Sequence, residues 1–325
     1  MMLFLPRNKM KILVLGLTLF TIGYYVKSIS QNVFELDFSL NRGIENKISN
    51  NTILNRQKVP KILHYAYPDD PENRPFTFIH WLAMTSAIET IKPEKTLFHC
   101  VHEPESYWYQ LIKHKISVVK ARIVTEIFGN PVKVLQHKSD VIRMEALRDY
   151  GGIYLDLDVL VFKPFDDLLY DDFTMGIEMV PNAVGLCNAV MISRPFAPFL
   201  TRWIEQYKYF DDNDYNYHSV LLPYNLSKKY EDDIHVLNET AFFWPTWVED
   251  HLKWVHTSNE YDFSNQYAYH MWFTRGYNKY LRRLTPTLIR NVETSFNKVV
   301  RKFLNYLPDN FNEEIFKQEM IGENR

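Results

Sequence analysis

The chain has 325 residues and a formal net charge of −2, and 46% of its residues are hydrophobic. This length and content suffice for a large buried core, and the scattered basic residues give no indication of a nucleic-acid-binding surface. Two cysteines, Cys100 and Cys187, are too few for a disulfide-rich scaffold or a structural zinc site, and the sequence leaves open whether they pair.

The first predicted element is an uncharged apolar segment between Lys11 and Lys27. A helix of this length spans roughly 22 Å, less than a bilayer core of about 30 Å, but lysines at both ends can reach the interfaces. We predict a cytoplasmic tail at 1–11 and a signal-anchor helix at 12–27, oriented by the basic flank. A cleaved signal peptide is the alternative, because residues 28–30, Ser-Ile-Ser, resemble a cleavage site.

Both interpretations bring the chain into the secretory pathway. Three Asn-X-Ser/Thr sequons, at Asn50, Asn225 and Asn238, are compatible with that location. Residues 28–57 are polar, rich in Asn and Ser, and without sustained periodicity, so we expect a flexible stem. These features predict a single-pass type II protein of the Golgi or endoplasmic reticulum membrane, with the rest of the chain lumenal.

From residue 58 onwards, predicted strands and helices alternate. Strands are expected at 58–68 and 95–103, with a helix at 77–91 between them. Residues 114–128 fit either a helix or a strand, and residues 132–135 fit a short strand. Such alternation indicates a largely parallel sheet covered by helices, in which ligands bind beyond the carboxyl ends of the strands.

A helix is predicted before the most informative part of the chain. Ser139 is a good N-cap, and Gly151 with Gly152 would end the helix, because glycine readily adopts a positive φ. Asp140 and Arg143 share the inward helical stripe with apolar residues, close to the start of the next strand. The structural alternative for these two residues is a helix-dipole carboxylate with an i, i+3 partner.

The predicted strand at 153–162 contains Asp156 and Asp158 in an otherwise apolar run. Alternation places both carboxylates on one face, where they repel unless a cation lies between them or they emerge at the carboxyl end of the sheet. Carboxylate oxygens suit Mg²⁺, Mn²⁺ or Ca²⁺, and a diphosphate would complete the coordination shell. We therefore predict a divalent cation site that binds a diphosphate-bearing substrate.

Residues 139–164 resemble the DXD-containing sugar-binding region of glycosyltransferase family 32, which includes mannosyltransferases and α1,4-glycosyltransferases. The shared pattern is an aspartate, an arginine three residues later, a glycine pair and the run Tyr-Leu-Asp-Leu-Asp. Segments 59–68, 186–200 and 268–272 are similar to further elements of that family. The resemblance covers roughly residues 58 to 275.

This resemblance implies a GT-A-type fold, with a Rossmann-like mixed sheet flanked by helices. It places a single catalytic domain at 58–285, behind the membrane anchor. Beyond it, apolar residues at helical spacing predict a C-terminal amphipathic helix and tail at 286–325. We expect this helix to pack on the catalytic domain, with a membrane-surface role as the alternative.

The resemblance also implies roles for individual residues. Donor-binding residues would be Tyr65, Tyr67, Asp140, Arg143, Tyr154, Asp156 and Trp272. The ligands of the metal cofactor, Mn²⁺ or Mg²⁺, would be Asp156, Asp158 and His270. The catalytic residues would be Asp156, Asp158 and Asn188, with Asn188 on the reacting face of the sugar.

Structural interpretations stay open for four of these residues. Tyr65 and Tyr67 fit core aromatics as well as nucleotide-base contacts. His270 fits a buried hydrogen-bonded histidine, and Asn188 fits a residue that only satisfies backbone groups.

The implied activity is metal-dependent, retaining transfer of a hexose from GDP-mannose or a UDP-hexose to a hydroxyl of a glycan or glycolipid. No feature identifies a general base, although Glu178 and Asp250 are candidates. One alternative is a catalytically silent, membrane-anchored carbohydrate-binding or scaffold protein. Another is an Asp-X-Asp phosphatase of the haloacid dehalogenase type, which leaves Asp140 and Arg143 unexplained.

Overall fold

The computed structural model describes residues 56–180 and 183–313. The predicted anchor, nearly all of the predicted stem and the sequon at Asn50 lie outside these residues. The chain divides into two units between residues 56 and 57, and the architecture below is that of the second. Across the described ranges, no helix combines the length and apolar character needed to cross a membrane.

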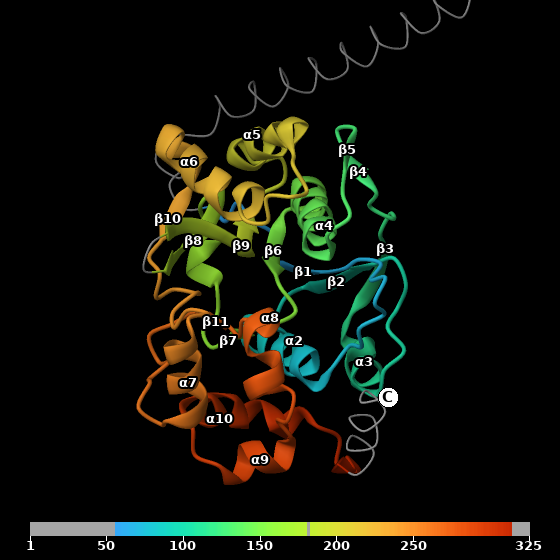
Figure 1. The fold of residues 1–325 in the computed structure, drawn as a ribbon, viewed down its shortest axis with the longest axis vertical. Coiled ribbons are helices and arrows are strands. Elements are labelled where there is room, and N and C mark those ends of the chain that lie inside the picture. The colour runs from blue at the N-terminus through green and yellow to red at the C-terminus, as the bar shows by residue number, and fades with distance from the viewer. Residues whose placement is uncertain (1–55, 181–182, 314–325) are drawn as a thin grey trace, which may run out of the picture. The chain divides into compact units, whose positions relative to one another are not determined.

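A mixed β-sheet forms the centre of this unit. Its strands are β1 (Ile62–Tyr67), β2 (Lys95–Cys100), β3 (Ser117–Lys120), β6 (Gly152–Leu155), β8 (Phe173–Val180), β9 (Ala183–Ser193) and β10 (His235–Leu237). Within the described residues the sheet has seven strands in the order β10-β8-β9-β6-β1-β2-β3 (Figure 1). β9 is antiparallel to both of its neighbours, and the other neighbouring pairs are parallel.

Two short antiparallel ladders lie outside this sheet. They pair β4 (Glu126–Ile127) with β5 (Asn130–Pro131), and β7 (Val159–Val161) with β11 (Ala268–His270). The second ladder matters for function, because it joins the segment after the two aspartates to a segment more than a hundred residues later.

Helices cover both faces of the sheet. They are α2 (Phe78–Ile91), α3 (Tyr107–Ile112), α4 (Leu135–Tyr150), α5 (Pro198–Gln206), α6 (Leu222–Lys229), α7 (Glu249–Thr257), α8 (Phe273–Gly276), α9 (Pro286–Asn291) and α10 (Ser295–Val300). In Figure 1, α4 and α5 lie above the sheet, and α2, α3, α9 and α10 lie below it. This confirms the predicted mixed α/β sheet flanked by helices.

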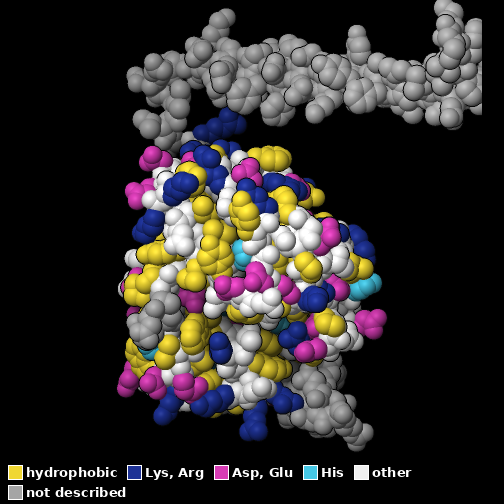
Figure 2. All heavy atoms as spheres, turned by 45° about the horizontal axis from the view of Figure 1, so that its top comes forward, with side chains coloured by type: hydrophobic (Ala, Val, Ile, Leu, Met, Phe, Trp, Pro, Cys, Tyr) yellow, Lys and Arg dark blue, Asp and Glu magenta, His cyan; other side chains and the backbone are white. Residues whose placement is uncertain are grey.

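Strand alternation divides the buried side chains between two apolar clusters. Ile153 and Leu155 of β6 pack in the cluster that contains α2, whereas Tyr154 packs with α4 and α5. Successive side chains of a strand point to opposite faces, so β6 supplies both clusters. On the outer surface, Figure 2 shows basic and acidic side chains interspersed, with hydrophobic side chains in small groups between them.

Most of the predicted elements before the aspartates are present. The strands predicted at 58–68 and 95–103 are β1 and β2, and the predicted helix at 77–91 is α2. Within the ambiguous segment 114–128 the chain forms β3 and β4. Both cysteines are buried free thiols.

The start of α4 differs from the prediction. Residues 132–135 form no strand, and α4 begins at Leu135, so Ser139 is not its N-cap. The backbone N–H groups of Lys133 and Val134 donate to the Asp212 carboxylate, at 3.0 and 3.3 Å. A carboxylate distant in sequence therefore holds the backbone just before α4, which local sequence could not indicate.

The end of α4 agrees with the prediction, since Gly151 and Gly152 have φ values of +62° and +115°. A Cβ atom on Gly152 would lie 2.4 Å from the carbonyl oxygen of Ile62 in the neighbouring strand. β6 therefore approaches β1 closely only because residue 152 has no side chain.

We expect Gly152→Ala to lower the free energy of unfolding by about 2–4 kcal/mol, from the positive φ and the overlap with β1. Urea unfolding followed by circular dichroism measures this change. Gly129→Ala is the matched control, because Gly129 also has a positive φ (+81°) but open space around its Cβ position. It should cost only about 1 kcal/mol, and equal losses in the two variants would contradict the packing argument.

The prediction of one continuous C-terminal amphipathic helix is wrong, because the structure forms two short helices there. α9 ends at Asn291, and Thr294 starts α10 because its hydroxyl accepts a hydrogen bond from the N–H of Asn297 at 3.1 Å. A 3₁₀ segment, Arg301–Tyr306, follows. Phe296 and other apolar residues of these turns pack in the same cluster as α2, so the segment is part of the main core.

The strand predicted at 153–162 is interrupted. β6 ends at Leu155 and β7 begins at Val159, so Asp156 and Asp158 lie in the turn between the two strands rather than on one strand face. The N–H of Asp156 still donates to the carbonyl of Ala189 in β9, at 2.9 Å. The two carboxylates therefore emerge at the carboxyl end of β6, which was the other arrangement allowed by their repulsion.

Candidate functional site

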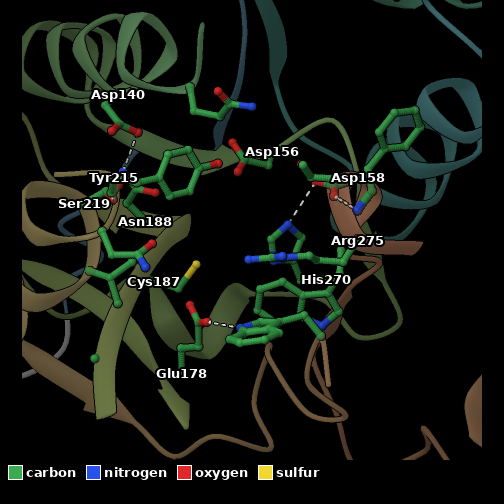
Figure 3. Close-up of a pocket in the computed structure, with 18 of the residues that line it drawn as sticks. Asp140, Asp156, Asp158, Glu178, Cys187, Asn188, Tyr215, Ser219, His270 and Arg275 are labelled. Carbon is green, nitrogen blue, oxygen red and sulfur yellow. Dashed lines mark hydrogen bonds and ion pairs between the residues drawn. The ribbon is translucent and has the colours of Figure 1, made fainter. Parts of the chain in front are cut away.

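Three predicted metal ligands lie together at this end of the sheet. Ligand atoms of Asp156, Asp158 and His270 all lie within 4.8 Å of one another (Figure 3). The β7–β11 ladder places Val159 opposite His270, which sets the imidazole beside Asp158. Local sequence at either segment gives no sign of this pairing.

The donor set fits a hard divalent cation. Two carboxylates and one imidazole suit Mn²⁺ or Mg²⁺ better than soft metals. His270 Nε2 lies 3.1 Å from Asp158 Oδ1, whereas His270 Nδ1 is buried and has no hydrogen-bond partner among the described residues. Nε2 is therefore the nitrogen next to the carboxylates, and it is the atom of His270 that would hold the ion.

The surroundings of Asp158 keep it ionised. Burial raises the pKa of Asp158, but His270 and the N–H of Phe273, which donates to Oδ2 at 2.8 Å, outweigh this and hold the pKa below its usual value. Burial lowers the pKa of His270, but the Asp158 and Asp156 carboxylates raise it above its ordinary value. Both oxygens of Asp158 are thus oriented before any ligand binds.

A buried polar network lies next to the three ligands. Arg143 donates to the side-chain oxygen of Asn188 at 2.7 Å and to its carbonyl at 2.9 Å. Asn188 Nδ2 donates to Asp140 at 2.7 Å, and Arg143 Nη2 lies 2.9 Å from Asp156 Oδ1. The Tyr154 hydroxyl also donates to Asp156, at 2.7 Å. The structure therefore brings these predicted site residues together.

This geometry changes two of the structural interpretations. Asn188 bridges two charged side chains, so the idea that it only satisfies backbone groups is wrong. Asp140 and Arg143 are more than an i, i+3 surface pair, because both are buried and their closest approach is 3.5 Å. Burial raises the pKa of Asp140, against the effect of Arg143, so its charge depends on this partner.

Two cavities meet at the candidate metal ligands. Their volumes are about 780 and 590 Å³. Both are lined by Arg143, Asp156, Asp158, Tyr215 and His270. The larger cavity continues past Tyr67 and Arg74, and the smaller one continues past Asp140, Asn188 and Trp247. A ligand that contacted the cation could therefore extend in two directions.

The two predicted base-contacting tyrosines have different environments. Tyr67 ends β1, lines the larger cavity and stacks on Phe98, with ring centroids 5.7 Å apart. Tyr65 is fully buried in the apolar cluster with α2 and lines neither cavity, so its predicted donor contact is wrong. Two strand residues span roughly 6.6 Å, which keeps Tyr65 inside the core while Tyr67 reaches the edge.

We expect Tyr65→Phe to leave the free energy of unfolding unchanged or to raise it by about 1 kcal/mol. The hydroxyl is buried, and no described residue hydrogen-bonds it, so its removal ends a desolvation cost. Chemical denaturation and the affinity for the predicted nucleotide-sugar donor are the measurements. A large loss of that affinity would show that Tyr65 does contact the donor.

Trp272 lies beside His270, with ring centroids 4.1 Å apart, and lines the smaller cavity. Its Nε1–H donates to the carbonyl of Pro245 at 3.0 Å, so this group is not available to a phosphate. Any diphosphate contact would have to use the ring. The predicted role of Trp272 in donor binding stays a prediction.

The two candidate bases differ in position. Glu178 lines the smaller cavity, whereas Asp250 is exposed in the first turn of α7 and lines neither cavity, so it is wrong as a site residue. Sequence reasoning missed Tyr215, Trp247 and Arg275, which also line the smaller cavity. These three lie in irregular or short segments without a recognisable motif.

Comparisons with known proteins agree with this chemistry. Residues 84–174 match the family described as "Glycosyltransferase sugar-binding region containing DXD motif". The chain is 41% identical over 260 residues to Glucan organizing enzyme 1 of Cryptococcus neoformans var. grubii, covering 76% of this chain and 71% of that protein. It is 27% identical over 157 residues to Mannosyl phosphorylinositol ceramide synthase SUR1 of Saccharomyces cerevisiae, covering 48% and 36%.

Among solved structures, the glycosyltransferase GlyE of Streptococcus pneumoniae TIGR4 is similar with a TM-score of 0.47 and 11% identity. The match covers 81% of this chain and 64% of that chain.

Proposed function

The chain belongs to a family of nucleotide-sugar-dependent glycosyltransferases whose sugar-binding region contains a DXD motif, and we propose that it transfers a hexose to a hydroxyl of a glycan or glycolipid. We propose GDP-mannose or a UDP-hexose as the donor, a GT-A-type arrangement of the catalytic domain at 58–285, and retention of anomeric configuration. The similarity to a protein named as a mannosyl phosphorylinositol ceramide synthase supports mannose as the transferred sugar.

One observation carries the proposal. Asp156, Asp158 and His270 converge at the point where the two cavities meet. A nucleoside diphosphate that contacts the cation can place its nucleoside in the larger cavity beside Tyr67. The sugar would then lie in the smaller cavity, near Asn188.

A bound Mn²⁺ or Mg²⁺ would act as a Lewis acid on the departing diphosphate. The protein supplies the rest of the donor's surroundings. Asp140, Asn188 and Arg143 are buried side chains at the cavity wall, and they offer acceptors and donors for sugar hydroxyls. Tyr154 fixes the orientation of Asp156 through its hydroxyl. Pre-orientation of this kind lowers the reorganisation needed in the transition state.

We further propose a single-pass type II protein of the Golgi or endoplasmic reticulum membrane, anchored at 12–27. The apolar segment with its basic flank supports this location. Asn225 and Asn238 are exposed, so both sequons are accessible for glycosylation in that compartment.

The test is release of nucleoside diphosphate by the purified full chain with Mn²⁺ and GDP-mannose, UDP-glucose, UDP-galactose or UDP-N-acetylglucosamine. Slow hydrolysis of one donor, lost with EDTA and restored by Mn²⁺, would support the transferase. Calorimetry with the same nucleotides follows if no donor is cleaved. Absence of both cleavage and metal-dependent nucleotide binding would contradict the proposal and favour the silent carbohydrate-binding protein.

A further inference from the structure

The smaller cavity extends beyond the residues proposed to hold the donor. This extension is lined by Glu178 of β8, Trp247 in the segment before α7, and Arg275 of α8. None of the three belongs to the DXD region, and they come from three separate parts of the chain. We refer to them as the Trp247 cluster.

Trp247 contacts both of the other members of the Trp247 cluster. Trp247 Nε1 donates to Glu178 Oε1 at 2.9 Å, and the Arg275 guanidinium lies 5.1 Å from the centre of the Trp247 ring. Figure 3 shows the Glu178 carboxylate near Cys187, on the opposite side of the pocket from Asp140 and Asp156, with its hydrogen bond to the indole dashed. The carboxylate is therefore held in place by the ring.

The chemistry of the Trp247 cluster matches a pyranose ring. The Arg275 guanidinium lies over one face of the Trp247 indole, so a sugar would use the other face or the rim of the ring. The apolar indole surface has negative potential, which attracts the weakly positive C–H groups on one side of a sugar. An ionised Glu178 only accepts hydrogen bonds, so it suits the hydroxyl donors at the edge of the ring. Arg275 is exposed, and its N–H groups can donate to hydroxyl oxygens of the same ring.

The charge of the cavity argues against an anionic occupant of this extension. Its wall carries the carboxylates of Asp140, Asp156, Asp158 and Glu178, and two arginines. Arg143 is already paired with Asp156, and Arg275 lies over the Trp247 ring, so four carboxylates face two arginines that both have other contacts. A nucleoside diphosphate carries about three negative charges, more than a divalent cation neutralises, so the donor would add negative charge at the metal ligands. A phosphate-bearing acceptor would be repelled, and a hydrocarbon chain would leave Glu178 desolvated.

We infer that the Trp247 cluster is the acceptor subsite and that it binds a neutral saccharide ring, so the acceptor hydroxyl belongs to a sugar residue. This inference rests on the proposed transferase function and specifies its second substrate. The nucleotide and the acceptor then approach the metal ligands from different cavities.

Binding can be tested without a metal or donor by the intrinsic tryptophan fluorescence of the full chain. The probes are gluco-, manno- and galacto-oligosaccharides and, for comparison, myo-inositol 1-phosphate. We expect one oligosaccharide series to change the emission with saturation, and Trp247→Phe to weaken its binding about tenfold or more. Trp254→Phe is the matched control, because Trp254 also donates to a glutamate, Glu260, but lies outside both cavities.

The kinetic test separates this inference from the proposed function. Glu178→Gln should raise the KM for the saccharide acceptor about tenfold, and lower transfer far more than donor hydrolysis, because it acts on the second substrate. Glu260→Gln, with the same chemical change outside the cavities, should alter neither.

Several outcomes would overturn the acceptor subsite. They are no response to any oligosaccharide, tighter binding of myo-inositol 1-phosphate, and equal effects of the Trp247 and Trp254 substitutions. An unchanged rate of sugar transfer in Glu178→Gln would also contradict the acceptor subsite. If the unmodified chain hydrolyses no donor, the proposed transferase function itself is contradicted.

Discussion

Asp158→Asn is expected to lower metal-dependent release of nucleoside diphosphate by roughly a thousandfold, equivalent to about 4 kcal/mol of transition-state stabilisation. Asparagine keeps the shape of the side chain and can still accept from the N–H of Phe273. It removes the charge that Asp158 contributes to the three-ligand cluster. Turnover at saturating donor and Mn²⁺ affinity by calorimetry are the measurements.

The matched control is Asp171→Asn, because Asp171 is a half-exposed carboxylate paired with His235 and lines neither cavity. It should retain full activity and Mn²⁺ affinity. An Asp158→Asn enzyme with turnover within about tenfold of the unmodified chain would show that the cation is held elsewhere or is not needed.

Arg143→Met is expected to cost about 3–5 kcal/mol of folding free energy, and to abolish turnover. The substitution leaves Asp140 buried without a cation, and it removes the partner of Asp156. It also leaves the side-chain oxygen of Asn188 without its donor. Losing one partner of a buried ionic network is costly because the remaining charge stays desolvated.

The pH dependence of this loss has a defined sign. Without Arg143 the folded-state pKa of Asp140, already raised by burial, rises further above its unfolded value. At pH values where Asp140 is protonated in both the folded and the unfolded chain, this shift does not destabilise the fold. The destabilisation grows as the pH rises above the pKa of Asp140 in the unfolded chain. The loss of unfolding free energy in Arg143→Met should therefore be larger at about pH 8 than at about pH 5. Urea unfolding at the two pH values measures it.

Two further variants complete this experiment. Arg122→Met removes an arginine that lies outside α4 and forms an exposed ion pair with Glu145 of α4, and it should cost less than about 1 kcal/mol. Asp140→Asn in the Arg143→Met background should recover part of the stability, because the unpaired buried charge is gone. A similar loss in both arginine variants would show that the Arg143 network contributes no more than a surface pair.

The sequence predicted much of the fold because its strongest signals are local. The apolar period of α2, the run that forms β1 and the glycines that end α4 each depend on neighbouring residues. The predicted start of α4 was wrong, and Asp212, far away in sequence, binds the N–H groups of the two residues before the helix. Long-range partners of this kind leave no trace in a local pattern.

The same distinction applies to the site. Asp156 and Asp158 are recognisable by their position in an apolar run, and Asp140 and Arg143 by their spacing before it. Tyr65 resembles Tyr67 in sequence, and only the position of the strand end separates them. Trp247 could not be assigned to the site from the sequence, because its proposed role depends on its contact with Glu178, 69 residues earlier in the chain.

The β7–β11 ladder also has a consequence for how the protein is made. Asp158 and His270 are 112 positions apart, yet they share one proposed ion. A nascent chain that has not yet reached β11 carries only the two aspartates, and their mutual repulsion stays uncompensated by the third ligand. Cation binding can therefore add its free energy only after most of the domain has left the ribosome, which makes it a late step of maturation rather than a nucleus for folding.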